Sequence, residues 1–198
     1  MLITSDANIK QANANGVTPL FIAAYNCHQD IVSTLITSGA NIDQAGLTPH
    51  YVAAENGDQD IVFMLVNAGA NINQAENGMT PLYIAAQKGH QDIVSTFITA
   101  GANIDLGNNV TLLCICIAAY NDHKDIASTL ITAGANINQA NVDGCNPILV
   151  AAQKGLQFII STLINAGAQN GKTTLYIAAQ NGHEDIVLMF ITAGANIE

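Results

Sequence analysis

The feature that most constrains this chain of 198 residues is an internal repeat. An Ala-Ala pair occurs six times, and a Gly-Ala pair follows each first alanine after sixteen residues. The alanine pairs begin at Ala23, Ala53, Ala85, Ala118, Ala151 and Ala178, and the Gly-Ala pairs begin at Gly39, Gly69, Gly101, Gly134, Gly167 and Gly194. Because this spacing is constant, all length variation falls in one connector per repeat. Such a period is typical of architectures in which each repeat packs against its neighbours.

Each repeat contains two short segments whose apolar residues are spaced as on one face of a helix. The first opens at a Thr-Pro step such as Thr18-Pro19, where threonine can cap backbone amides and proline fits the first helical position. The second opens at an aspartate whose charge favours the positive end of the helix dipole. These aspartates are Asp30, Asp60, Asp92, Asp125 and Asp185. Helices of about ten residues are not stable alone, so stacking must stabilise them.

The segment from Thr18 to Ala24, with a full period of 33 residues, resembles the ankyrin repeat. Thr48-Pro49 and Thr80-Pro81-Leu82 also match, and the resemblance covers essentially the whole chain. It implies an all-α solenoid of paired antiparallel helices with short β-hairpin or turn fingers. It also implies a concave face, made of fingers and first helices, that binds other proteins.

We expect a single ankyrin-repeat domain over residues 1–198. Residues 2–9 match residues 35–42, so the chain is expected to begin inside a second helix, with a partial repeat at 1–9. The six repeats that follow are expected at 10–42, 43–72, 73–104, 105–137, 138–168 and 169–198.

The last helix, around Leu188, is apolar nearly all round, whereas a terminal repeat needs a polar outer face. We hypothesise that the chain is a segment of a longer array, or that another molecule covers its C-terminal face in an end-to-end contact. The alternative is that terminal repeats are simply less polar here.

Four repeats depart from the pattern, and the second of the six lacks three connector residues. In the fourth repeat Leu113-Cys114 stand in place of Thr-Pro, unless two residues are inserted and Thr111 opens the helix. In the fifth repeat Phe158 replaces the aspartate that opens the second helix. In the sixth repeat the connector is short, so residues 169–172 are expected to form a stunted finger.

All five tyrosines lie in the first helices. Tyr25 and Tyr120 come two residues after the first alanine of the pair, and Tyr51, Tyr83 and Tyr176 come two residues before it. The two positions are four residues apart and so share a helix face. In the family this face belongs to the concave side, where tyrosine offers a large contact area at low entropic cost. The alternative is that the earlier position packs beneath the finger.

Further candidates for partner binding lie beside the tyrosines and at the fingers, because loops on a rigid scaffold often carry recognition. The candidates beside the tyrosines are Glu55, Gln87, Lys88, Gln153 and Lys154. The main candidates at the fingers are Met79, Val142 and Lys172, and the other tip positions are Ala14, Asn15, Val17, Leu47, Glu76, Asn109, Val110, Asp143 and Cys145.

The composition disfavours several classes of partner. The net charge is −10 and the five basic residues are all lysines, which is the wrong sign for nucleic acid or anionic lipid. No apolar stretch approaches the roughly 20 residues of a membrane span. The first residues lack the basic region of a secretory signal, so we expect a cytoplasmic protein with reduced cysteines.

Histidines and cysteines are the residues here that could carry chemistry. Four histidines share one position at the start of the second helix, where we expect a ring nitrogen to bond the turn of the neighbouring finger. They are His28, His90, His123 and His183. A thiol or metal site on Cys114 and Cys116 is less favoured, because residues two apart point to different sides of a helix. Catalysis by Cys27 with His28 is also less favoured, because His28 belongs to the recurring structural histidines and Cys27 takes the place of a glycine. We expect no metal or cofactor.

The sequence therefore predicts a non-catalytic scaffold that binds another protein of unknown identity through its concave face and fingers. The first alternative is a structural spacer within a longer repeat array. The second, less favoured, is the thiol or metal site on Cys114 and Cys116.

Overall fold

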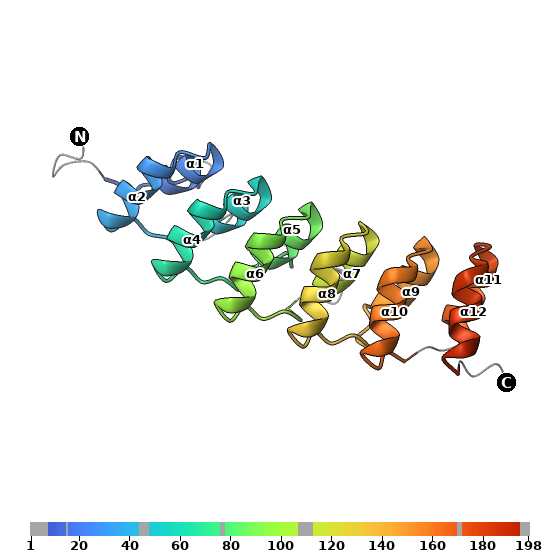
Figure 1. Ribbon diagram of the computed structural model, residues 1–198. Coiled ribbons are helices and arrows are strands. Elements are labelled where there is room, and N and C mark those ends of the chain that lie inside the picture. Colours follow the sequence, from blue (N-terminus) through green and yellow to red (C-terminus); the bar gives the residue numbers. More distant parts are fainter. Residues whose placement is uncertain are drawn as a thin grey trace. The chain divides into compact units, whose positions relative to one another are not determined.

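The computed structural model describes residues 8–14, 16–43, 48–75, 78–106, 113–169 and 172–194. Within these ranges the chain forms twelve α-helices, two in each of six repeats (Figure 1). The first helices are α1 (Pro19–Tyr25), α3 (Pro49–Asn56), α5 (Pro81–Lys88), α7 (Cys114–Tyr120), α9 (Pro147–Lys154) and α11 (Lys172–Gln180). The second helices are α2 (Gln29–Thr37), α4 (Gln59–Asn67), α6 (Gln91–Thr99), α8 (Lys124–Thr132), α10 (Gln157–Asn165) and α12 (Glu184–Thr192). The predicted all-α repeat fold is confirmed.

The chain divides into two compact units, Met1–Ala102 and Asn103–Glu198. In the first unit α3 packs between α1 and α5, and α4 packs between α2 and α6. In the second unit α9 packs between α7 and α11, and α10 packs between α8 and α12. Each unit is therefore built from two layers, one of first helices and one of second helices (Figure 1).

The first helices start largely where the sequence predicts. Thr18 and Thr80 cap α1 and α5, because each hydroxyl accepts a hydrogen bond from the backbone N–H three residues later, at 3.1 Å. Asn146 caps α9 in the same way at 2.9 Å, which the sequence analysis did not identify. Thr48 does not cap α3: its hydroxyl oxygen lies 3.3 Å from Nε2 of His50 instead.

The uncertain start of the fourth repeat is resolved in favour of the alignment without an insertion. Helix α7 begins at Cys114 with Leu113 at the N-cap position, and no side chain caps it. Thr111, the alternative start, lies outside the described residues.

The second helices begin one residue before the predicted aspartates, which therefore lie in the first turns of α2, α4, α6, α8 and α12. Helix α10 has no acidic residue in its first turn, as expected from Phe158. At the other end, Gly39 follows α2 with φ of +82°, a left-handed conformation that glycine adopts without steric cost.

The core of each repeat is made by small residues on the first helix and large ones on the second. In α3 the pair Ala53 and Ala54 is fully buried, so neighbouring helices can approach closely. In α4 Ile61, Val62 and Leu65 are fully buried. Burial of each large aliphatic side chain is worth about 1.5–3 kcal/mol relative to exposure.

The connectors are turns in the described residues, where no β-strand forms and Met79 alone makes an isolated bridge. The β-hairpin part of the expected fingers is therefore not observed there. Two turns are closed by the backbone, with the Asn13 N–H donating to the Val17 carbonyl at 2.9 Å and the Asn141 N–H to the Cys145 carbonyl at 3.0 Å.

A recurring hydrogen bond links the connectors of successive repeats. A side-chain oxygen of Asp43 accepts from the backbone N–H of Asn71, at 2.9 Å. In the second unit, Asp105 accepts from Asn136 at 2.9 Å and Asn138 accepts from Gln169 at 2.8 Å. These bonds fix the spacing of adjacent repeats within each unit.

None of the helices in the described residues combines the length and apolar character needed to cross a membrane.

Candidate interaction surface on the first helices

In the first unit, the C-terminal ends of the first helices carry an exposed aromatic ring and an ion pair. Tyr25 at the end of α1 is 54% exposed, and its ring stacks on Phe21 with a centroid distance of 6.3 Å. Nζ of Lys88 on α5 lies 3.4 Å from Oε1 of Glu55 on α3. We call Tyr25, Glu55 and Lys88 strip 1.

The second unit carries a related surface. Tyr120 at the end of α7 is 49% exposed, and Nζ of Lys154 on α9 lies 3.8 Å from the centroid of its ring. This geometry is a cation–π contact, worth about 0.5–1 kcal/mol at an exposed site. Gln153 beside Lys154 is exposed. We call Tyr120, Gln153 and Lys154 strip 2.

Carbonyl groups at the strip positions are anchored by the following repeat. Asn56 donates from its side-chain amide to the Tyr25 carbonyl at 2.9 Å. Nε2 of His90 donates to the Glu55 carbonyl at 3.2 Å, and Nε2 of His183 donates to the Gln153 carbonyl at 3.3 Å. These side chains hold the backbone from which the exposed strip residues project.

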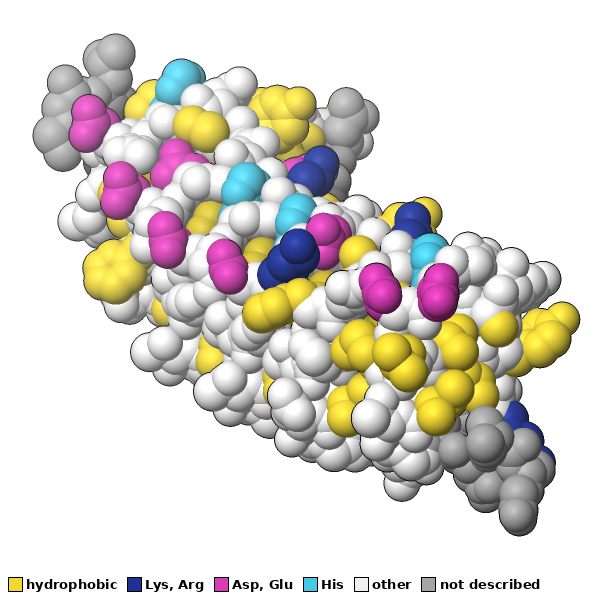
Figure 2. All heavy atoms as spheres, turned by 45° about the vertical axis from the view of Figure 1, so that its right-hand side comes forward, with side chains coloured by type: hydrophobic (Ala, Val, Ile, Leu, Met, Phe, Trp, Pro, Cys, Tyr) yellow, Lys and Arg dark blue, Asp and Glu magenta, His cyan; other side chains and the backbone are white. Residues whose placement is uncertain are grey.

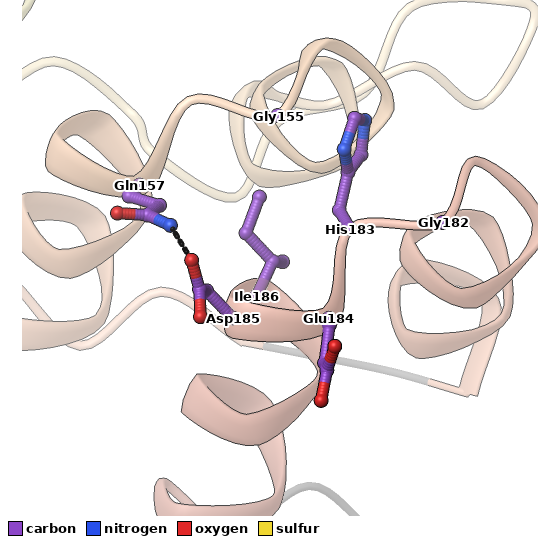
Figure 3. Close-up of a pocket in the computed structure, with 7 residues that line it drawn as sticks. All are labelled: Gly155, Gln157, Gly182, His183, Glu184, Asp185 and Ile186. Atoms are coloured by element: carbon purple, nitrogen blue, oxygen red, sulfur yellow. Dashed lines mark hydrogen bonds between the residues drawn. The ribbon is translucent and has the colours of Figure 1, made fainter.

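The histidines correct one detail of the sequence analysis. Their expected acceptor was the turn of a neighbouring finger, whereas His90 and His183 bond to the end of the first helix in the previous repeat. The His183 ring lies directly beside Gly155 (Figure 3). A Cβ on Gly155 would lie 2.8 Å from Cε1 of His183, and one on Gly57 would lie 2.7 Å from Cε1 of His90. Glycine is therefore required both for its positive φ and for the space that the ring fills.

The five tyrosines differ in their exposure. Tyr51 and Tyr83 are only 8% exposed, so they belong to the packed interior. Tyr51 is enclosed because α3 packs between α1 and α5. Tyr176 occupies the same repeat position but is 65% exposed. The structure thus leaves Tyr25, Tyr120 and Tyr176 on the surface.

The remaining candidates also differ. Val142 is exposed, and Met79 and Gln87 are half-buried. Lys172 is exposed, but it is the first residue of α11 rather than part of a stunted finger. Among the other tip positions, Ala14, Val17, Asp143 and Cys145 are described, and Asn15, Leu47, Glu76, Asn109 and Val110 lie outside the described residues.

The family comparison agrees with this architecture. The model of ankyrin repeats, in sets of three copies, matches residues 1–76, 43–108, 70–141 and 115–198. These overlapping matches cover the whole chain. The chain belongs to the ankyrin-repeat family. Ankyrin repeats are generally modules for protein–protein interaction and typically have no catalytic role. No curated protein matches the chain.

The four cysteines of this ankyrin-repeat chain are free thiols that differ in burial. Cys114 and Cys116 are buried in α7, whereas Cys27 is exposed and Cys145 is half-buried. Burial raises the pKa of the Cys116 thiol to about 12, so this residue is protonated at neutral pH and is a poor nucleophile. Within the described ranges, no group of three or more His, Cys, Asp or Glu residues is placed to hold a metal ion.

A small hollow at the start of α12 is polar and structural (Figure 3). It has a volume of about 280 Å³. Nε2 of Gln157 donates to Oδ2 of Asp185 at 2.6 Å, which links α10 to α12. Gln29 makes the equivalent bond to Asp60 in the first unit, at 3.3 Å. These contacts fasten adjacent second helices of the ankyrin array.

A groove that the repeat pattern did not predict lies between α4 and α6, on the second-helix layer. It has a volume of about 450 Å³ and is lined by Phe63 and Val66 on one side and by Asp92 and hydroxyl side chains on the other. Phe63 is exposed at a repeat position that holds serine in four other repeats. A position-by-position comparison of the repeats identifies Phe63, because only Phe63 and Leu188 depart from serine at this position.

Proposed function

We propose that this ankyrin-repeat chain is a non-catalytic scaffold that binds another protein through the exposed side chains of its first helices. The observation that supports this most directly is the exposure of Tyr25 and Tyr120, which occupy the same repeat position in separate units. An aromatic ring half exposed to water gains contact area and loses little conformational entropy when a partner covers it.

The backbone beneath these rings is well supported. The helices that carry the strips pack on their neighbours, and Asn56, His90 and His183 hold carbonyls at the strip positions. A surface that is already ordered loses little conformational entropy on binding, so more of the contact energy appears as affinity.

The strips favour a protein partner over a strongly charged polymer. Strip 1 combines Tyr25 with the paired charges of Glu55 and Lys88, and strip 2 combines Tyr120 with Lys154 and the amide of Gln153. Aromatic rings surrounded by mixed polar groups are typical of protein interfaces. The net charge of −10 disfavours a nucleic-acid partner.

The test is a pull-down from the native lysate with the wild-type chain and the double variant Tyr25→Ala/Tyr120→Ala. Truncation of an aromatic anchor costs about 2 kcal/mol or more, so each substitution should weaken capture by more than about tenfold. The matched control is Phe63→Ser, which removes a similarly exposed ring from the groove between α4 and α6 and should leave capture unchanged.

Thermal melting of the same samples separates binding from packing. We expect the double variant to melt within a few degrees of the wild type, because both rings are about half exposed. Unchanged capture by the folded double variant would contradict the proposal. So would a large fall in melting temperature with no loss of capture by the folded fraction, since the rings would then be packing residues.

The structural spacer remains the second candidate function, and one observation favours it. The first and last described repeats expose apolar residues, such as Ile22 and Ile191, on the sides that would face further repeats. A spacer would use these sides and leave both strips without a partner, so the same pull-down would capture nothing through Tyr25 or Tyr120.

A further inference from the structure

The contact between α4 and α6 lacks a hydrogen bond that fastens other second helices. Gln29 on α2 donates to Asp60 on α4 at 3.3 Å, and the corresponding pair on α10 and α12 is bonded in the same way. On α4 and α6 the corresponding residues are Gln59 and Asp92, which both line the groove between the helices. The Asp92 carboxylate makes no hydrogen bond or ion pair with any residue that the structure describes. The groove is therefore open where the equivalent contacts are closed.

The polar side chains on the α6 wall of this groove accept hydrogen bonds but have no hydroxyl donor to spare. The hydroxyls of Ser95, Thr96 and Thr99 each donate to a backbone carbonyl of their own helix, at 3.1, 2.9 and 2.8 Å. Their remaining lone pairs and the Asp92 carboxylate are acceptors. A ligand on this wall must therefore supply donors, and the carboxylate favours donors that carry a positive charge.

The α4 wall supplies apolar surface. Phe63 is 59% exposed and Val66 is half-buried, and both line the groove. The face of an aromatic ring attracts a cation, and arginine is the cation that stacks on such rings most often. Its flat guanidinium also offers five donors, which suits a carboxylate better than the compact ammonium of lysine does.

The surroundings of the groove attract a positive group. Asp30, Asp60 and Asp92 lie in the first turns of the three second helices of the first unit. Figure 2 shows acidic side chains exposed beside hydrophobic ones on the surface of the chain. The net charge of −10 adds to this attraction.

We propose that the groove between α4 and α6 binds a segment of a partner protein in which an arginine stands next to a leucine or a similar aliphatic residue. The guanidinium lies against the Phe63 ring and pairs with the Asp92 carboxylate, and the aliphatic side chain covers Val66. Charge complementarity favours this occupant over an acidic segment. It also disfavours a second copy of this chain, which is itself strongly acidic and has no arginine.

Binding at this site is expected to be weak and separate from strips 1 and 2. A groove of about 450 Å³ takes only a few side chains, so we expect a Kd of about 0.1–1 mM for a short peptide. A contact this weak is lost during the washes of a pull-down. Capture through the strips is therefore independent of the groove.

An NMR titration of the whole isotope-labelled chain with a capped tetrapeptide that contains leucine followed by arginine is the direct test. In about 0.15 M salt, which screens general attraction, we expect saturable shifts of the α4 and α6 amides. The same peptide with citrulline for arginine keeps its size but loses its charge, and should bind about fivefold more weakly or worse. No saturable shift at α4 and α6 with peptide up to about 5 mM would overturn the proposal, as would equal binding of the citrulline peptide.

Variants of the two walls sharpen the test. Phe63→Ser and Asp92→Asn should each weaken binding of the arginine peptide by about fivefold or more. The matched controls are Phe158→Ser and Asp30→Asn, which remove a similarly exposed ring and an equivalent first-turn carboxylate outside the groove. Both controls should bind like the wild type, and the spectra show whether each variant folds. Unchanged affinity of Phe63→Ser or Asp92→Asn would overturn the proposed contacts, and equal weakening by Asp30→Asn would show general attraction to the acidic chain instead.

The same titration keeps this proposal distinct from the function proposed for the strips. The double variant Tyr25→Ala/Tyr120→Ala leaves the groove intact, so it should bind the arginine peptide like the wild type. Loss of peptide binding in this variant would contradict a site on the second-helix layer. Failure of the strips to capture a partner would leave the peptide result unchanged.

Discussion

His50 shows how one residue can set the acid sensitivity of a repeat. It lies fully buried on α3 at a position that holds leucine or isoleucine in every other repeat. Burial lowers its pKa to about 4, and the nearby Asp43 carboxylate and Asn71 backbone only partly oppose this. The ring also binds the Thr48 hydroxyl, which explains why that threonine does not cap α3 as Thr18 caps α1.

This burial predicts a loss of stability in mild acid. Below pH 6.5 the unfolded chain binds a proton at His50 that the folded chain does not accept until about pH 4. Because the unfolded state binds more protons in this window, the free energy of unfolding should fall as the pH is lowered from about 6.5 to about 4, by about 3 kcal/mol in total.

Urea denaturation of the wild type and His50→Leu across this pH range measures the effect. Leucine is the residue at the corresponding positions of the first and third repeats, and it also releases Thr48 to cap α3. The stability difference between variant and wild type should therefore widen as the pH falls. Parallel curves for the two proteins would show that His50 is not responsible.

At the scale of the helices, the residue that starts a second helix packs against the end of the first helix in the previous repeat. His90 and His183 lie over Gly57 and Gly155 of the previous repeat. Where the glycine is replaced, by Cys27 and Asp122 with φ of +57°, the next repeat has no histidine at this position. The residues there are Asp58 and Leu156. The ring and the missing Cβ therefore occur as a pair.

This pairing predicts a coupling between α9 and α12. Gly155→Ala should lower the free energy of unfolding by about 2 kcal/mol or more, because alanine pays for the left-handed conformation and its Cβ meets the His183 ring. In a His183→Leu background the same change should cost only about 1 kcal/mol, since the conformational penalty alone remains. Chemical denaturation of the four proteins gives the coupling energy, and equal costs in both backgrounds would contradict the contact.

Much of this level of structure could be predicted from the sequence. The constant spacing of alanine and glycine pairs gave the helix pairs, and the Thr-Pro steps and aspartates gave most helix starts within one residue. The acceptor of the histidine rings could not be predicted, and the sequence left open whether Tyr51 binds a partner or packs beneath the finger. Both depend on which neighbouring helix covers a residue, and the spacing of residues along the chain does not reveal how closely two helices approach. Phe63 was missed for a different reason, since only comparison between repeats reveals it.

At the scale of the whole molecule, the chain is an array of helix pairs, each too short to be stable alone. Stability comes from apolar contacts between successive repeats within each unit, and this leaves the C-terminal ends of the first helices exposed without loss of core. We propose that strips 1 and 2, which present rings and charges suited to another protein, use this exposure for binding.

Hydroxyl-radical footprinting of the chain alone and bound to its captured partner tests the central claim most directly. The radical modifies exposed aromatic side chains, so it reports on each ring separately. We expect modification of Tyr25 and Tyr120 to fall several-fold in the complex, while Phe63 and Phe158 on the second helices remain as reactive as before. Protection of Phe63 or Phe158 with Tyr25 and Tyr120 still fully reactive would show that the partner binds the other layer and would contradict the account.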